Sequence, residues 1–193
     1  MSCLAHTALA AHWPRVEDAI ARGQWSNFTV EPDPTNDLVR YVHVYADRGG
    51  TTLWHCFRIW FPNYPIEPPS LQCVHPRTKE LARKGYTPWW PRSTAPNINL
   101  QPDSDPPYFC FPYTLEWVRT HSALPDTDRH RWRAGSPDPH TVFATLTELR
   151  RIFRPAYYQG YFAPTFEETL RELDANDPSP FSPWAAASAD PRA

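Results

Sequence analysis

Residues 57–69 read FRIWFPNYPIEPP, and in this segment an apolar strand pattern runs into a corner that contains four prolines. The alternation of apolar residues extends back to Thr51 and predicts a strand over residues 51–61. The side chains expected on its buried face are those of Leu53, His55, Phe57, Ile59 and Phe61. Because proline cannot donate a ladder hydrogen bond, we expect the strand to end before Pro62 and the chain to turn over residues 62–69. A short strand, Ser70–Val74, is predicted to follow.

The segment before this corner predicts two further strands. Alternating residues indicate strands at Trp25–Val30 and Leu38–Ala46. The sequence DRGG at residues 47–50 is typical of a turn and connects the second of these strands to residues 51–61. Because consecutive strands with short connections usually lie next to each other, we expect an antiparallel meander of four strands.

A helix is predicted over residues 8–22, ahead of the first strand. Its apolar residues are spaced by four, three and four positions and form one stripe, namely Leu9, Trp13, Val16 and Ile20. Proline is tolerated in the first turn of a helix, so we expect the regular part to begin near Pro14. Gly23 is expected to end the helix.

The second half of the chain predicts a long loop followed by two helices. Residues 75–139 are rich in Pro, Asp and Trp and are expected to be mostly loop, held by aromatic packing. Asp138 as N-cap and Pro139 as first residue predict a helix that ends before Pro155. A capping box at residues 165–168, TFEE, predicts the start of a third helix.

This order of elements predicts an α+β fold. We expect a single domain over residues 1–173 and a disordered Pro- and Ala-rich tail over residues 174–193. The 24 prolines exclude long uninterrupted helices, and the net charge of −2 argues against a nucleic-acid-binding protein. The sequence has neither an apolar run of ~18 residues nor a signal-peptide pattern, so we expect a cytoplasmic protein that does not bind membranes.

Three motifs, in this order, resemble the ubiquitin-conjugating enzyme family. Tyr64-Pro65-x-x-Pro68-Pro69 resembles the corner between strands three and four of that family, and the segment PNIN at residues 96–99 resembles the end of its His-Pro-Asn signature. Cys110 follows, and Trp117 comes seven residues later, as a Trp follows the catalytic Cys in the family. The resemblance covers roughly residues 8–173. The sequence departs from the family at Ala95, where the signature has His, and in three insertions: before Asn97, between Asn97 and Cys110, and over residues 120–137.

The resemblance implies a fold and a function. The fold would be that of ubiquitin-conjugating enzymes, and Cys110 would accept a ubiquitin-like protein as a thioester from an ATP-dependent activating enzyme. The modifier would then pass to an amine of an acceptor protein, and the carrier itself would need no nucleotide or metal cofactor. Asn97 would stabilise the oxyanion or order the adjacent loop, with Asn99 in that role if the register differs. The insertions are typical of bacterial relatives, which often act in antiphage defence.

The four cysteines are far apart in the sequence, and we interpret all of them as free thiols. Cys56 and Cys73 lie inside predicted strands and are expected to be inert core residues. Cys3 is close to the N-terminus. Cys110 lies in the long loop and is therefore the candidate nucleophile, because a thiolate is both a good nucleophile and a good leaving group.

The proton acceptor for the incoming amine stays open at this stage. The family often has an acidic or Ser residue after its second helix, but residues 155–160 read PAYYQG and contain no acid. His121, Asp126, Asp128 and His130 of the last insertion are candidates to replace it, although an ordinary charged surface loop explains them equally well.

Three other functions are compatible with the sequence. An inactive binding module of the same fold would have a buried and dispensable Cys110. A cysteine hydrolase would need a Cys110–His pair, which spacing in the sequence cannot identify. A zinc site would have to combine His55, Cys56, Cys73 and His75, but His55 and Cys56 are expected on opposite faces of one strand and the usual ligand spacing is missing.

Overall fold

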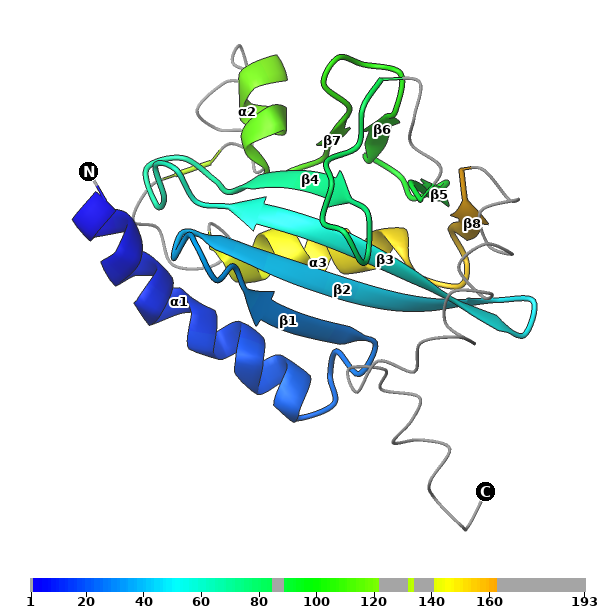
Figure 1. Ribbon diagram of the computed structural model, residues 1–193, viewed down its shortest axis with the longest axis horizontal. Helices are drawn as coiled ribbons and strands as arrows, with labels where there is room; N and C mark the ends of the chain where they lie inside the picture. Colours follow the sequence, from blue (N-terminus) through cyan, green and yellow to red (C-terminus); the bar gives the residue numbers. More distant parts are fainter. Residues whose placement is uncertain (1, 85–88, 122–131, 134–140, 163–193) are drawn as a thin grey trace.

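The computed structural model describes residues 2–84, 89–121, 132–133 and 141–162, and its architecture is α+β, as predicted. Its centre is an antiparallel sheet with the strand order β1-β2-β3-β4. The four strands are β1 (Phe28–Pro32), β2 (Val39–Arg48), β3 (Thr51–Trp60) and β4 (Ser70–Val74). One helix, α3 (Val142–Ile152), crosses one face of this sheet, and α1 (Ser2–Ala21) runs beside β1 (Figure 1).

The predicted meander is confirmed, and the bounds of β4 match the prediction residue for residue. Strand β2 begins one residue later than expected and ends two residues later, at Arg48, so only Gly49 and Gly50 remain for the turn, and both have positive φ angles. Strand β1 begins at Phe28 rather than Trp25, because the backbone N–H of Phe28 closes a turn onto the carbonyl of Trp25. The predicted inner face of β3 is fully buried, with His55 among its members.

Helix α1 differs from the prediction at its start. It begins at Ser2, so Pro14 lies in the helix interior and not in the first turn. A proline at this position leaves the carbonyl of Ala10 without its helical donor, which ordinarily costs ~3 kcal/mol. Pro14 and Ala10 are both on the exposed side, while the opposite side is buried in the core through Leu9, Trp13, Val16 and Ala19. The burial of that apolar stripe offsets the lost hydrogen bond.

The expectation that residues 75–139 are mostly loop holds for the described part of this region, but short regular elements interrupt the loop. The described part contains three short strands and one short helix: β5 (Pro91–Ser93), β6 (Asn99–Gln101), β7 (Tyr108–Cys110) and α2 (Leu115–Thr120). A further strand, β8 (Tyr158–Tyr161), pairs with β5, and β6 pairs with β7. Strands of three residues are too short to show an alternating pattern, and the six residues of α2 make fewer than two helical turns.

Helix α3 occupies the segment predicted for the second helix, but it starts later. Its N-cap is Thr141, and it ends at Ile152, three residues before Pro155. Asp138 and Pro139, which were expected to begin it, lie outside the described residues, as do the third helix predicted from Thr165 and the tail over residues 174–193.

The proline-rich corner is where several distant segments meet. The hydroxyl of Tyr64 lies 2.5 Å from Nδ1 of His12 in α1 and accepts the backbone N–H of Val142 at the start of α3. The carbonyl of Pro65 accepts the indole N–H of Trp132 at 2.9 Å. The carbonyl of Pro69 accepts the N–H of Leu115, the first residue of α2. The corner therefore connects both long helices to α2, which lies beyond β4 next to β6 and β7 (Figure 1).

Within the described residues, none of the helices combines the length and the hydropathy that crossing a bilayer requires.

Candidate functional site

Cys110 is the last residue of β7, and the packing of its two neighbours fixes its position. Phe109 and Phe111 are both fully buried. The ring of Phe109 stacks on Trp90 with 4.3 Å between ring centroids and meets Phe57 of β3 edge to face at 5.4 Å. Because side chains alternate along a strand, burying Phe109 in the core directs Cys110 to the other face of the β6–β7 hairpin.

Helix α2 covers the Cys110 side of this hairpin. Its N-cap is Thr114, whose hydroxyl accepts the N–H of Trp117 and donates to the carbonyl of Phe111 at 2.8 Å. The helix is thereby attached to the residue that follows Cys110. Its last turn brings two polar groups to the thiol: Oγ1 of Thr120 lies 3.4 Å from Sγ of Cys110, and Nδ1 of His121 lies 4.0 Å from it.

The surroundings of Cys110 keep its thiol protonated. The residue is 5% exposed, and burial raises the pKa of its thiol above the ordinary value. The negative charge of Glu116 raises this pKa as well, whereas the hydrogen bond to Thr120 lowers it. Glu116 itself accepts the hydroxyl of Ser70 at 2.5 Å, and burial raises the pKa of its carboxyl group. The site therefore favours a neutral thiol over a thiolate.

The structure separates the two asparagines that the sequence suggested. Asn97 precedes β6 in an exposed turn, with a left-handed backbone (φ 59°) that asparagine tolerates better than most residues. Asn99 is the first residue of β6 and is the direct cross-strand partner of Cys110. Directly opposed residues of an antiparallel pair project to the same face, with Cβ atoms about 5 Å apart. Asn99 is thus the asparagine that the hairpin brings to the thiol.

His121 is one of four residues that the sequence left open, and it is the only one of them among the described residues; the structure brings it to Cys110. Its ring stacks on the indole of Trp117, with a centroid distance of 3.8 Å and an interplanar angle of 12°. Asp126, Asp128 and His130 lie outside the described residues. The sequence signal for this contact was the Thr-His pair ten and eleven residues after Cys110. This pair indicates a contact with Cys110 only once it is known that Thr114 begins a helix.

The other three cysteines have the surroundings that the sequence predicted. Cys3 is exposed, whereas Cys56 and Cys73 are buried in β3 and β4, and all four thiols are free. Burial raises the pKa of Cys56 to about 12, even though Nζ of Lys79 lies 3.6 Å from its sulfur. Burial also raises the pKa of Cys73 far above the ordinary value. Both residues are therefore poor nucleophiles in the folded protein.

The zinc site considered from the sequence finds no support in the described part of the chain. His55 is fully buried between the carbonyl of Trp89 and the hydroxyl of Tyr158. Cys56, its neighbour in β3, points to the opposite face, where it pairs with His43 of β2. Among residues 2–84, 89–121, 132–133 and 141–162, no three or more His, Cys, Asp or Glu side chains are grouped so as to hold a metal ion.

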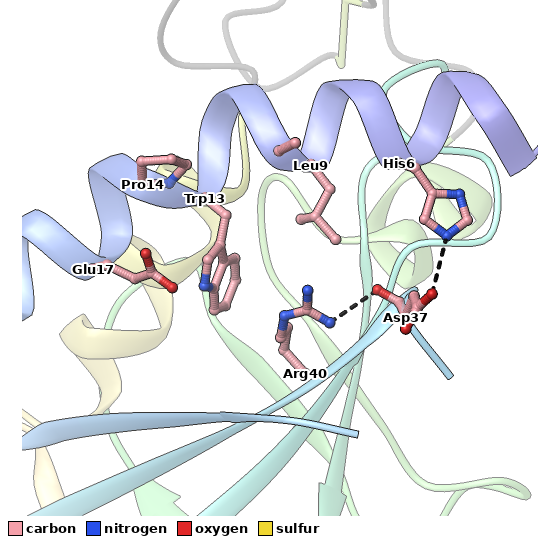
Figure 2. Close-up of a pocket in the computed structure, with 8 residues that line it drawn as sticks. His6, Leu9, Trp13, Pro14, Glu17, Asp37 and Arg40 are labelled. Atoms are coloured by element: carbon pink, nitrogen blue, oxygen red, sulfur yellow. Dashed lines mark hydrogen bonds and ion pairs between the residues drawn. The ribbon is translucent and has the colours of Figure 1, made fainter. Parts of the chain in front are cut away.

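A groove of about 370 Å³ lies between α1 and the segment over residues 37–40 at the start of β2 (Figure 2). Figure 2 shows the guanidinium of Arg40 between Trp13 and Asp37, and the carboxylate of Glu17 on the other side of Trp13. The guanidinium of Arg40 lies 5.7 Å from the ring centroid of Trp13 and donates to the carbonyl of Asp37. None of the residues that line this groove belongs to the Cys110 site.

No protein-family model matches this sequence, and a comparison with curated proteins finds no match either.

Proposed function

We propose that the protein is a carrier similar to ubiquitin-conjugating enzymes, which holds a ubiquitin-like protein as a thioester on Cys110. The observation that carries the proposal is the position of this thiol. Of the four cysteines, Cys110 alone lies between a hairpin asparagine, Asn99, and two polar side chains at the end of a helix, Thr120 and His121. Such a group of side chains suits acyl transfer, because charge that develops near the sulfur finds donors already in position.

The order of the elements supports the finer fold assignment that we propose. An N-terminal helix, a four-stranded meander with a proline-rich corner between its last two strands, the hairpin of Cys110 and a helix on the sheet follow one another in the sequence. This is the order that the resemblance to ubiquitin-conjugating enzymes implies. The corner also has a physical role in the site, because the carbonyl of Pro69 and the hydroxyl of Ser70 hold the first turn of α2.

The proposed reaction has two acyl-transfer steps. The sulfur of Cys110 attacks the thioester carbonyl of a modifier that is bound to its activating enzyme, and the thiol of that enzyme leaves. An amine of the acceptor protein then attacks the new thioester, an amide bond forms, and the sulfur of Cys110 leaves with the bonding electron pair. In each step the carbonyl oxygen becomes negatively charged, and the side-chain amide of Asn99 is the donor that we assign to it.

The partners in this proposal are a ubiquitin-like modifier, an ATP-dependent activating enzyme and an acceptor protein. ATP is consumed by the activating enzyme, so the carrier needs no nucleotide or metal of its own. We place this chemistry in the bacterial cytoplasm, in a defence system against phages, on the resemblance alone.

Two other candidate functions are each favoured by one observation. The exposed fraction of Cys110, 5%, is what an inactive binding module of the same fold would have. The distance of 4.0 Å between Sγ of Cys110 and Nδ1 of His121 is what a cysteine hydrolase would need. In both cases the thiol would not be found attached to a protein at steady state.

The test compares the wild type with Cys110→Ser after expression in the native host, on reducing and non-reducing gels. We expect a larger band for the wild type that disappears with added thiol. The serine variant should form an oxyester that resists thiol, and the mass of that adduct identifies the modifier. Cys3→Ser is the matched control and should keep the thiol-sensitive band. If neither the wild type nor Cys110→Ser is modified while an active activating enzyme is present, the carrier function is wrong.

A further inference from the structure

The imidazole of His121 is held in one orientation at the end of α2. Its ring stacks on Trp117, and its Nδ1 is 3.1 Å from the carbonyl oxygen of Trp117 and 2.9 Å from Oγ1 of Thr120. The same nitrogen is 4.0 Å from Sγ of Cys110. One face of the ring and one of its two nitrogens are therefore occupied by α2 and the thiol.

The hydrogen bonds around Nδ1 determine which nitrogen carries the proton. A carbonyl oxygen can only accept, so we assign a proton to Nδ1, which lies 3.1 Å from the carbonyl of Trp117. The hydroxyl of Thr120 has one proton, for which the carbonyls of Glu116 at 2.9 Å and Trp117 at 3.1 Å are both acceptors, so we assign its oxygen as an acceptor toward Nδ1. In the neutral imidazole the second nitrogen, Nε2, then carries the lone pair.

Nε2 faces away from these contacts. Among the described residues, no group hydrogen-bonds to it, and the side chain of His121 is only partly buried. The result is a fixed imidazole with a donor directed at the protein and a basic nitrogen accessible to a molecule that approaches Cys110.

We propose that His121 is the proton acceptor for the amine that attacks the thioester on Cys110, an inference that rests on the carrier function proposed above. The amine nitrogen bonds to the thioester carbonyl carbon and its proton passes to Nε2. The carbon–sulfur bond then breaks, the electron pair goes to Sγ of Cys110, and the proton returns from the imidazolium to that sulfur. The products are an amide and the free thiol, so atoms and charges balance.

Nδ1–H has a second role in this step. The leaving sulfur develops negative charge, and Nδ1 of His121 lies 4.0 Å from it. A small approach of the two groups would convert this contact into a charge-assisted hydrogen bond. One imidazole then assists both the attacking nitrogen and the leaving sulfur.

Other side chains that could take the proton are absent or already engaged in the described part of the site. Residues 155–160, which follow α3, contain no acid. Glu116 is the nearest carboxylate in α2, but its oxygens accept the hydroxyl of Ser70 and the N–H of Leu71. Aspartates of the segment over residues 122–131 lie outside the described residues, so a histidine-specific readout is needed in the test.

The experiment uses a small thioester because the modifier is unidentified. Full-length protein with Cys3→Ser is treated with S-phenyl thioacetate, which places an acetyl group on Cys110 and releases thiophenol. After removal of the reagent, the acetyl-protein is mixed with free L-lysine, and its decay and the formation of acetyl-lysine are followed by mass spectrometry. Cys110→Ala in the same background gives the contribution of other sites.

The compared variants are His121→Gln, His121→Ala and the surface control His6→Gln. We expect all three to be acetylated on Cys110 within about twofold of the parent rate. Transfer to lysine should fall by ~10²-fold or more in both His121 variants, which is the usual contribution of a general base. Added imidazole should restore part of the rate in His121→Ala but not in His121→Gln, where no space is left, and a purely structural role would give no such rescue.

Each contrary result has a defined meaning. If His121→Gln transfers acetyl to lysine at the parent rate, His121 is not the proton acceptor. If acetylation and transfer slow by the same factor, the imidazole acts on the thiol itself, and the inference is wrong although the carrier function stands. If Cys110 of the folded parent protein is not acetylated at all, the carrier function and this inference are both overturned.

Discussion

Replacing His55 should change how the stability of this protein depends on pH. His55 lies on the inner face of β3 and is fully buried. Its Nδ1 is 3.2 Å from the carbonyl of Trp89 and its Nε2 is 2.6 Å from the hydroxyl of Tyr158. The neutral ring satisfies both groups, because Nδ1–H donates to the carbonyl and Nε2 accepts the hydroxyl proton. A second proton would leave a buried charge with no carboxylate among these partners.

The magnitude follows from the pKa of this side chain. Burial lowers the pKa of His55 from 6.5 to about 3. Between these two pH values the unfolded chain binds a proton at this residue and the folded protein does not, so stability falls as the pH is lowered. A slope of about 1.4 kcal/mol per pH unit over this window amounts to roughly 5 kcal/mol. The pKa of His43, lowered to about 4 mainly by burial and by the charge of Lys79, adds a second contribution of roughly 3 kcal/mol.

Together these losses are comparable to the whole stability of a typical domain, about 5–15 kcal/mol, so we expect the protein to unfold near pH 4. The assay is urea unfolding, followed by tryptophan fluorescence, at intervals between pH 7 and pH 4.5. Gln at position 55 can donate to Trp89 and accept from Tyr158. His55→Gln should therefore be less stable than the wild type at pH 7 by about 1–3 kcal/mol. The stability of the variant should fall less steeply with decreasing pH than that of the wild type, and the two slopes should differ by about 1.4 kcal/mol per pH unit. The stability curves of the variant and the wild type should therefore converge by pH 4.5.

His6→Gln is the matched control, because the side chain of His6 is 43% exposed. Its stability curve should stay parallel to that of the wild type. If His55→Gln and the wild type lose stability with the same slope between pH 6.5 and pH 4.5, then His55 is not held neutral by burial and the reasoning from its environment is wrong.

Three further predictions concern the thiols and one buried-charge contact. Alkylation of the native protein with iodoacetamide at pH 7.5, followed by peptide mass spectrometry, should modify Cys3 at least tenfold faster than Cys110. Cys3 is exposed, whereas the burial of Cys110 restricts access to its thiol and raises the pKa of that thiol. Equal rates would contradict the burial of Cys110. Glu116→Gln removes a negative charge near Cys110 and should lower the pKa of that thiol. The rate of alkylation of Cys110, measured as a function of pH, should then rise at lower pH than in the wild type. An unchanged dependence on pH would show that the carboxylate has no effect on the sulfur. Lys79→Met removes an ammonium group that lies 2.7 Å from Glu31, whose side chain is partly exposed, and thermal unfolding should report a loss of about 0.5–1 kcal/mol, against no loss if the pair is fully screened.

The parts of the fold that could be predicted are those in which one pattern governs a whole element. Strands β3 and β4 were predictable because the inner face of β3 is apolar at every second residue and prolines end the strand at one side of the corner. Pro14 misled the prediction for α1, because propensity rules describe an isolated helix and this one is stabilised by packing along its whole length. Strands β5 to β8 consist of three or four residues, and their pairing depends on partners up to 70 positions away, Pro91 with Tyr161, which no local pattern contains.

The candidate site was predictable only in its central residue. Cys110 stood out because the other cysteines are terminal or inside strands. The choice between Asn97 and Asn99 depends on the register of the β6–β7 hairpin, and one pairing, Asn99 with Cys110, settles which of them is opposite the thiol. The contact with His121 depends on where α2 begins and ends. Because Thr114 is the N-cap and His121 the C-cap of α2, two residues that are eleven positions apart, Cys110 and His121, come within 4.0 Å of each other, measured from Sγ to Nδ1. Composition and spacing in the sequence do not show this contact.

The state of the thiol favours the carrier that we propose over a hydrolase. A hydrolase activates its cysteine by keeping it as a thiolate with a depressed pKa, beside a histidine that accepts the proton. Here burial and Glu116 raise the pKa of Cys110, and the nitrogen of His121 that faces it carries a proton of its own. A thiol of higher pKa is also a poorer leaving group, so its thioester reacts more slowly with weak nucleophiles such as water. The same surroundings that slow the loading of Cys110 would therefore preserve the thioester until a strong nucleophile arrives, and removal of the charge at Glu116 should shorten the lifetime of the acyl-protein in water.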